Sequence, residues 1–350
     1  MQFFEKKDLL SLTPDEILSF TVESGYQKFR AKQILEWMYR GKDFSEMTTL
    51  PEKMRAELSE VATVNLPKIR KKLVSEVDGT VKYLFSLYDG NLIESVVMRY
   101  AHGLSICISS QCGCRMGCRF CASTIGGRIR DLLPSELLGQ IIVASADLGE
   151  RISHVVMMGI GEPLDNYDNV IRFLRLVNMP EGLGISYRNI SLSTCGVVPK
   201  ILKLAEEAFP ITLSISLHAP NDAARSEIMP INNTYSVSEL LYACNTYFQK
   251  TGRRISFEYT LISGKNDSKE NARELANVLK KYIKGPLHVN LIPLNPVSER
   301  DYKTVDRRFA MKFCEALISL GINATVRRTL GPDINASCGQ LRRSEEKSNI

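Results

Sequence analysis

Five of the nine cysteines in this chain fall within one short stretch, and three of them have the spacing Cys114-x-x-x-Cys118-x-x-Cys121. Three closely spaced thiolates suit a soft metal centre. A [4Fe–4S] cluster usually has four cysteine ligands, so a set of three leaves one iron with an open position for a small molecule. The spacing therefore predicts a cluster that takes part in chemistry and does not only store electrons.

Other uses of these cysteines fit the sequence less well. A zinc site favours a second C-x2-C pair or paired histidines downstream, but no second pair is present and the four His are scattered. A disulfide framework is typical of small secreted chains. This chain has 350 residues, and its start, Met-Gln-Phe-Phe-Glu-Lys-Lys-Asp, lacks the apolar core of a signal peptide. We interpret Cys112 as a structural thiol, because the ligand spacing is complete without it.

The composition is that of an ordinary globular protein, with 44% hydrophobic and 24% charged residues. The length suits one large domain plus a small one. No apolar run reaches membrane-spanning length, so no membrane association is expected. Nine cysteines without a secretion signal indicate a reducing, cytoplasmic setting. The net charge of +6 permits an RNA partner without requiring one.

The first third of the chain is predicted to start with helices. Thr13-Pro14-Asp15-Glu16 is a capping box with proline at the first helical position, and the helix it opens should end near Gly25. A second helix carries Trp37, and Pro51 opens a third. This arrangement resembles a helix-hairpin-helix nucleic-acid module, a pattern that many small helical domains share.

Strands are expected to follow these helices. The basic run at residues 68–72 is interpreted first as a solvated edge strand and second as an RNA contact. Residues 81–87 and 92–98 predict two strands around the turn at residues 88–91.

From about residue 104 strands and helices alternate, which predicts a parallel sheet with helices packed outside it. Six or seven such units suit an open or partial (β/α) barrel better than a closed eightfold one. The predicted fold class is therefore α/β. The expected strands are Leu104–Ser109, His154–Gly159, Asn189–Thr194, Ile211–Leu217, Ile255–Ile262, Leu287–Pro293 and Asn323–Thr329, and the expected helices include Pro134–Leu148, Asp168–Val177, Val237–Gln249, Lys269–Tyr282 and Val305–Leu320.

Reactive or polar residues stand where these strands end, which is the rim that carries catalytic groups in parallel α/β barrels. Each is a weak signal alone, and their shared placement strengthens it. The candidates are the three cysteines after the first strand, Gly159–Leu164 after the second, Ser193 and Thr194 at the third, Ser216–His218 at the fourth, Asn295 after the sixth and Cys338 after the last.

Taken together, these motifs resemble the RlmN family of radical S-adenosylmethionine (SAM) RNA methyltransferases, to which Cfr is closely related. C-x3-C-x2-C is the cluster spacing of radical SAM enzymes, and the resemblance covers nearly the whole chain. The other segments that carry it are Asp78-Gly79-Thr80, Ile93–Ser95, Cys107–Gln111, Gly161–Leu164, Ser193–Gly196, Ser216–His218, Met229–Asn232, Asn290–Pro296 and Ala336–Leu341.

The resemblance implies a fold, a division of the chain and a set of cofactor contacts. The fold is a partial (β/α) barrel of the radical SAM type with a small N-terminal helical and β accessory domain. The implied division is an accessory domain at 1–99, a radical SAM core at 100–335 and a C-terminal segment at 336–350. Cys114, Cys118 and Cys121 match the ligands of a [4Fe–4S] cluster. The residues that match SAM contacts are Gly161, Glu162, Ser193, Ser216, Leu217, His218 and Asn295.

The resemblance also implies a reaction that uses two SAM molecules per turnover. Cys338 matches the cysteine that accepts a methyl group, Cys107 matches the second essential cysteine, and Glu94 matches a residue assigned as proton acceptor. Carbon C2 of adenine is electron-poor and cannot attack SAM, whereas a thiolate can. A radical formed from the second SAM would activate the methyl on Cys338 for addition to C2. Cys107 would then release the product by forming a disulfide with Cys338. Glu94 and Cys107 both remain candidates for the base.

The implied partners are 23S rRNA, transfer RNA and a reductant such as flavodoxin or ferredoxin, with the protein acting as a monomer. Within the same class, the alternative is Cfr-like methylation at adenine C8. From a different class, the alternative is a non-enzymatic iron–sulfur protein that binds RNA or senses redox state. That protein would have no need of Gly161, Glu162 or Cys338.

Overall fold

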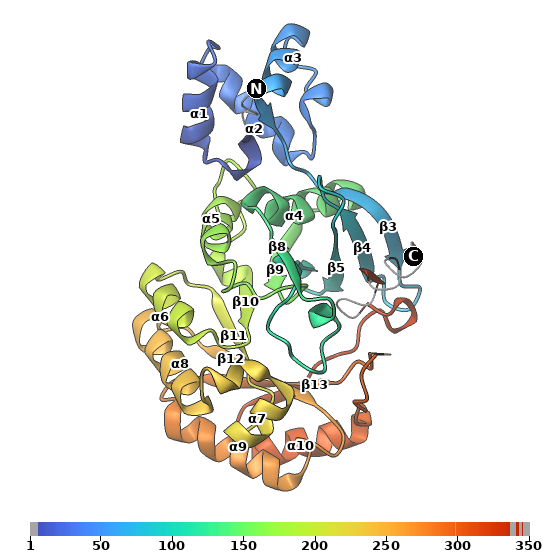
Figure 1. The fold of residues 1–350 in the computed structure, drawn as a ribbon, viewed down its shortest axis with the longest axis vertical. Coiled ribbons are helices and arrows are strands. Elements are labelled where there is room, and N and C mark those ends of the chain that lie inside the picture. Colours follow the sequence, from blue (N-terminus) through green and yellow to red (C-terminus); the bar gives the residue numbers. More distant parts are fainter. Residues whose placement is uncertain (1–5, 298, 337–340, 343–344, 346–350) are drawn as a thin grey trace.

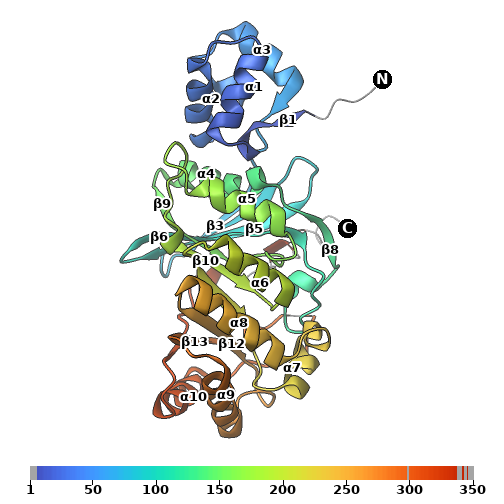
Figure 2. The same ribbon diagram turned by 90° about the vertical axis from the view of Figure 1, so that its left-hand side faces the viewer.

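The computed structural model describes residues 6–297, 299–336, 341, 342 and 345. Figures 1 and 2 show an α-helical region at one end of the long axis, a large sheet in the middle and a second group of helices at the other end. The N-terminal region contains β1 (Lys7–Asp8), α1 (Pro14–Glu23), α2 (Phe29–Tyr39), α3 (Glu52–Val61) and β2 (Ala62–Thr63).

This N-terminal region forms as its caps predict. The side chain of Thr13 accepts the backbone N–H of Glu16, and the carboxylate of Glu16 accepts the N–H of Thr13, so the capping box is confirmed. Pro51 stands directly before α3, as expected. The apolar faces of the three helices bury Ile17, Ile34 and Leu58 in one core.

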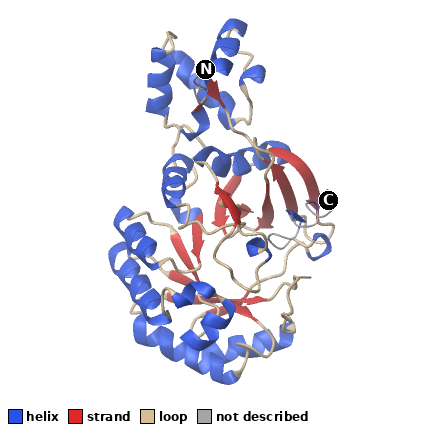
Figure 3. Cartoon of the chain, in the orientation of Figure 1, coloured by secondary structure: helices blue, strands red, loops and turns tan. Residues whose placement is uncertain are grey.

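A ten-stranded sheet forms the centre of the molecule, in the order β14-β13-β12-β11-β10-β9-β6-β5-β4-β3. The pairs from β6 and β9 to β13 and β14 are parallel, and those among β3, β4, β5 and β6 are antiparallel. Helices lie outside this curved row of strands (Figure 3). The strands are β3 (Lys68–Val74), β4 (Val81–Ser86), β5 (Leu92–Tyr100), β6 (Gly103–Cys107), β9 (Ile152–Met157), β10 (Ile190–Thr194), β11 (Thr212–Ser216), β12 (Ile255–Leu261), β13 (Leu287–Pro293) and β14 (Ala324–Val326).

The remaining helices are α4 (Pro134–Leu148), α5 (Tyr167–Val177), α6 (Val198–Glu207), α7 (Asp222–Ile228), α8 (Val237–Thr251), α9 (Lys269–Tyr282) and α10 (Arg307–Ser319). The predicted open α/β sheet and its strand order along the chain are confirmed. The predicted helix 134–148 and helix 269–282 are reproduced to the residue. Helices between the strands were expected, but no bounds were predicted for α6 and α7.

The basic run lies on β3, an edge strand of the sheet, so the edge-strand interpretation is confirmed. Most residues of β3 are exposed, whereas every residue of β12 in the parallel half is buried. Parallel strands covered on both faces have this character. Among the described residues, no helix is long and apolar enough to cross a membrane.

Candidate active site

The loop that carries the three cysteines is closed at its base by a short hairpin of β7 (Gln111–Gly113) and β8 (Arg128–Asp131). The N–H of Cys114 donates to the carbonyl of Gly127 at 3.0 Å. Gly113 has a φ of +77°, and a Cβ there would lie 2.0 Å from that same carbonyl oxygen. Only glycine therefore allows the two strands to meet this closely.

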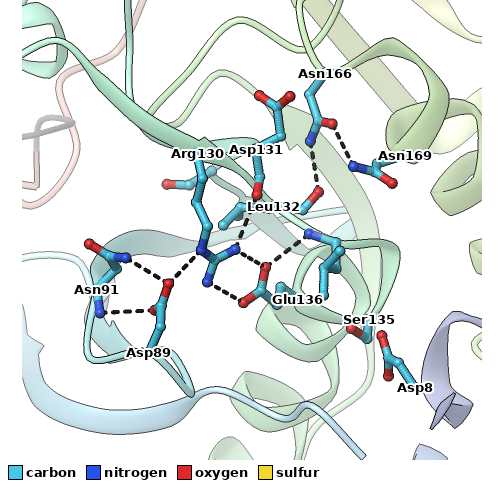
Figure 4. A network of polar contacts seen from close by, with 12 residues as sticks. Asp8, Asp89, Asn91, Arg130, Asp131, Leu132, Ser135, Glu136, Asn166 and Asn169 are labelled. Atoms are coloured by element: carbon cyan, nitrogen blue, oxygen red, sulfur yellow. Dashed lines mark hydrogen bonds and ion pairs between the residues drawn. The ribbon is translucent and has the colours of Figure 1, made fainter. Parts of the chain in front are cut away.

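Arg130 fixes this hairpin to α4 and to the β4–β5 turn of the central sheet (Figure 4). Its guanidinium donates two hydrogen bonds to Glu136 in α4, at 2.7 and 2.8 Å, and one to Asp89 in the β4–β5 turn at 2.5 Å. The carboxylate of Glu136 also accepts the N–H of Leu133 at the start of α4. The side chain of Arg130 is therefore occupied by two carboxylates.

A cavity of about 220 Å³, here the cysteine cavity, lies above the parallel strands. It is lined by all three loop cysteines and by residues from the ends of β9, β10, β11 and β12, as barrel architecture predicts. Of the proposed contacts, the lining includes Cys114, Cys118, Cys121, Gly161, Glu162, Ser193, Ser216 and His218.

The three cysteine thiols influence one another. Burial raises the pKa of Cys118 well above its usual range, and neighbouring Cys121 and Cys114 raise it further. Burial likewise raises the pKa of Cys114 to about 12. Within the described part of the chain, no three His, Cys, Asp or Glu side chains are grouped to bind a single metal ion. Cysteine thiolates are the ligands of iron–sulfur clusters, and all three of these cysteines line one cavity.

Glu162 is a buried carboxylate at the wall of this cavity, with 3% of its surface exposed. Its oxygens accept the N–H groups of Leu164 at 3.0 Å and Cys195 at 2.7 Å. Burial raises the pKa of Glu162, although these hydrogen bonds act in the opposite direction. A ligand with an ammonium group would offset the cost of burying this carboxylate, which is the chemistry that SAM offers.

His218 follows β11 in a left-handed conformation, with a φ of +57°. Its Nδ1 accepts the N–H of Thr260 at 2.9 Å, so the neutral ring carries its proton on Nε2. Burial, together with the charge of Arg225, lowers the pKa of His218 to about 3. The ring of Phe120, from the cysteine loop, packs edge to face against the His218 ring, with the two ring centroids 5.0 Å apart. His218 is thus a neutral ring that fixes one side of the cavity.

Two further residues of the cysteine cavity were missing from the predicted site. Glu258 is 4% exposed and accepts the side-chain amide of Asn290 at 2.7 Å. Arg327, after β14, also lines the cavity, and its charge lowers the pKa of Glu258, although burial raises it overall. A single carboxylate in the otherwise apolar run 255–262 was the available signal for Glu258.

A second cavity of about 350 Å³, here the Glu94 cavity, adjoins the first. Glu94 and Cys107 line it, together with residues between Arg327 and Ala336, after β14. Burial raises the pKa of the Cys107 thiol, while Arg327 acts in the opposite direction. The volume of the Glu94 cavity lies within the range of roughly 300–1,000 Å³ that is usual for small-molecule sites.

Not all predicted site residues meet in one place. Asn295 lines the Glu94 cavity and not the cysteine cavity, and Leu217 is fully buried and lines neither. Cys107 has a free thiol, and no disulfide joins the described cysteines. Cys338 lies outside the described residues. Cys112 is fully buried, in keeping with the structural role expected for it.

The fold and the three-cysteine loop define the class of this protein. Residues 108–276 match the radical SAM superfamily, and residues 7–64 match the ribosomal RNA large subunit methyltransferase N-terminal domain. A crystal structure of a radical SAM methyltransferase from Sphaerobacter thermophilus superposes with a TM-score of 0.90 at 40% identity. That likeness covers 95% of this chain and 98% of the other.

Curated relatives narrow the class further. Two are described as "Probable dual-specificity RNA methyltransferase RlmN". The protein from Clostridium botulinum (strain Alaska E43 / Type E3) is 53% identical over 343 residues, covering 98% of each chain. The protein from Clostridium tetani is 51% identical over 347 residues, covering 99% of each chain. The chain belongs to the RlmN family. Its cofactors are accordingly a [4Fe–4S] cluster and SAM.

Proposed function

We propose that this protein is a radical SAM methyltransferase that places a methyl group on C2 of an adenosine in 23S rRNA and in transfer RNA, through a methyl group carried on Cys338. The observation that carries the proposal is the shared wall of the two cavities. Met158, Gly159, Ile292 and Arg327 line both. A group activated in the cysteine cavity would therefore lie beside a substrate base in the Glu94 cavity.

The residues present fit both cofactors. Cys114, Cys118 and Cys121 would hold the cluster, and buried Glu162 would accept from the amino group of SAM. Gly161 has a φ of +109°, and a Cβ there would lie 2.7 Å from Gln111, so only glycine lets this turn lie against the start of β7 beside Glu162. When bound, the cluster and SAM would supply the radical chemistry that an unreactive methyl carbon requires.

Cys338 and Cys107 would share the remaining chemistry. The Cys338 thiolate would accept the methyl group and later link the protein to C2 of the base. Cys107, in the wall of the Glu94 cavity, would attack the sulfur of Cys338. That attack forms a disulfide and breaks the sulfur–carbon bond, so the methylated base is released. The proton on C2 would pass to Glu94 or to Cys107, both of which line this cavity.

The target adenosine would have to leave its stack to reach this interior. Arg327 and Arg328 line the Glu94 cavity and could meet the phosphates beside the base. We further propose that a reductant such as flavodoxin or ferredoxin supplies the electrons and that the enzyme acts as a monomer in the cytoplasm. Its proposed domains are residues 1–99, 100–335 and 336–350.

Mass spectrometry of nucleosides tests this function in a strain that lacks the gene. The 2-methyladenosine of 23S rRNA and of transfer RNA should disappear, and the wild-type gene should restore it. The Cys338→Ala gene should not restore it. Loss of 8-methyladenosine instead would assign the Cfr-like activity, and unchanged RNA would leave only an iron–sulfur protein without this methylation.

A further inference from the structure

The part of the chain that follows β14, here called the segment, is held by the β3–β4 hairpin, which lies more than 250 residues away along the sequence. Figure 1 shows the stretch around residues 331–336 beside β3 and β4. The exchange of contacts is reciprocal. Asp78, in the hairpin turn, accepts the N–H of Gly331 at 2.9 Å. Asp333, in the segment, accepts the N–H of Glu76 at 2.9 Å and the hydroxyl of Ser75 at 2.6 Å.

Asp78 performs two tasks with its two oxygens. One accepts the N–H of Thr80 at 3.0 Å and closes the hairpin turn, and the other holds Gly331. Gly331 has a φ of +56°, and a Cβ there would lie 2.7 Å from the Cβ of Ala336. The N–H of Ala336 in turn donates to the carbonyl of Gly331 at 3.1 Å. The segment is therefore compact and is fixed at its first residue.

Lys82 and Glu94 fix the segment at two further points. They form an ion pair at 3.2 Å with side chains that are 0% and 1% exposed. The ammonium of Lys82 also donates to the carbonyl of Asn335 at 2.9 Å. The other oxygen of Glu94 accepts the N–H of Arg342 at 2.6 Å. One buried pair thus holds the backbone on both sides of residues 337–340.

A buried ion pair is a weak source of stability, because desolvation offsets most of the Coulomb attraction. The desolvation cost of the Lys82–Glu94 pair is better explained if the pair is needed to hold the backbone in one fixed position. These contacts hold residues 331, 335 and 342, and Cys338 stands between the last two in the sequence. Glu94 itself lines the cavity in which the substrate base is proposed to react.

We propose that Asp78 and Lys82 are positioning residues, which together with Glu94 hold the backbone at Gly331, Asn335 and Arg342 and so support methylation of Cys338, which stands between the last two in the sequence. This inference rests on the proposed role of Cys338 as methyl carrier. It assigns a use to the Asp78-Gly79-Thr80 motif, which lines neither cavity.

The first test measures hydrogen exchange in the intact, cluster-loaded protein. Asp78→Ala should accelerate amide exchange in the peptide that contains Gly331 and Ala336. Asp43→Ala is the matched control, because Asp43 also accepts the N–H two residues ahead, at 2.9 Å, but lies in the N-terminal helical region and lines neither cavity. An unchanged exchange rate in Asp78→Ala would contradict the proposal that Asp78 holds the segment to the hairpin.

The second test separates positioning from stability. Protein with its full iron content is mixed with SAM, and peptide mass spectrometry follows the methyl group on Cys338. A misplacement of about 1 Å can cost ~10²-fold in rate. Asp78→Ala and Lys82→Met should therefore slow methylation of Cys338 by roughly 10–100-fold, while SAM binding and iron content stay at the wild-type level. Asp43→Ala should methylate at the wild-type rate, because Asp43 lines neither cavity.

Lys82→Met leaves a buried carboxylate without its cation, so Lys82→Met/Glu94→Gln serves as the second variant if the single one does not fold. Methylation at the wild-type rate in Asp78→Ala and in either Lys82 variant would overturn the inference. Absence of any methyl on Cys338 in the wild-type protein would instead overturn the proposed function, and the exchange experiment would still decide whether Asp78 holds the segment to the hairpin.

Discussion

The cysteine cavity is built from the ends of parallel strands and the loops that follow them. The Glu94 cavity instead joins strands β5 and β6 to residues 327–336, which lie far away in the sequence. In the first, a short loop and successive strand ends supply the lining. In the second, Glu94 and Cys107 on β5 and β6 face residues 327–336. The proposed cofactor site is thus built from local turns, and the proposed substrate site is built from parts of the chain that lie far apart in the sequence.

The largest effect should come from breaking the cysteine cavity alone. Replacing Cys114, Cys118 and Cys121 together with Ala should abolish the [4Fe–4S] cluster, because no thiolate ligand remains in the loop. Iron analysis and Mössbauer spectra of anaerobically reconstituted protein measure this. Cys112→Ala is the control: its thiol is fully buried two residues before the first ligand and should not be needed for a full cluster. A cluster retained in the triple variant would refute the ligand assignment.

Breaking the Glu94 cavity should leave the cluster in place and stop the reaction later. Cys107→Ala should still carry a methyl on Cys338 and should accumulate RNA covalently bound through Cys338, because the second thiol is missing. Denaturing gels with and without ribonuclease would show a shifted, nuclease-sensitive band.

The double variant Cys107→Ala/Cys338→Ala should show no such band, because nothing links the RNA. Released methylated RNA from Cys107→Ala, without a cross-link, would reduce Cys107 to a packing residue.

The same contrast explains what the sequence could predict. The Thr13 capping box and the alternation after residue 104 are local signals, and each predicted its element correctly. The cysteine spacing is also a local signal, and the three cysteines line one cavity. The strand ends also placed Glu162 and His218 at one rim, since parallel strands end at one edge.

The rest depends on distant partners. Lys82 is a buried lysine in β4, and its partners Glu94 and Asn335 come from other parts of the chain. Arg130 is held by Asp89 and Glu136, which come from separate elements of the chain (Figure 4). Asn295 was grouped with the SAM contacts on resemblance, whereas the chain bends after β13 so that it lines the Glu94 cavity. No local pattern encodes such pairings.

A smaller effect concerns stability, and compares a buried lysine with an exposed one on the neighbouring strand. Lys82→Met should lower the free energy of unfolding by ~3–5 kcal/mol, because it leaves the Glu94 carboxylate buried without its cation. Lys72→Met should lower it by at most ~1 kcal/mol, because the Lys72–Asp147 pair is partly exposed. Urea unfolding of both variants measures the difference. Equal losses would show that the Lys82–Glu94 pair is no more desolvated than a surface pair.

The smallest effect is a pH dependence that originates in the cysteine cavity. Since the folded pKa of His218 is lowered to about 3 from 6.5, the unfolded chain binds the proton more readily. The stabilisation is present above the unfolded pKa and is lost as pH falls from 6.5 toward 3. His218→Asn removes this titration while keeping a side-chain acceptor near Thr260 and a residue that tolerates positive φ.

Between about pH 7.5 and about pH 5.5, the wild-type protein should therefore lose ~1.4 kcal/mol more than His218→Asn. Anaerobic urea unfolding at both pH values measures this difference. An identical loss in the two proteins would mean that His218 takes up a proton in the folded state. The Nδ1 acceptor for Thr260 would then be absent, and the neutral ring could not be what fixes this side of the cavity.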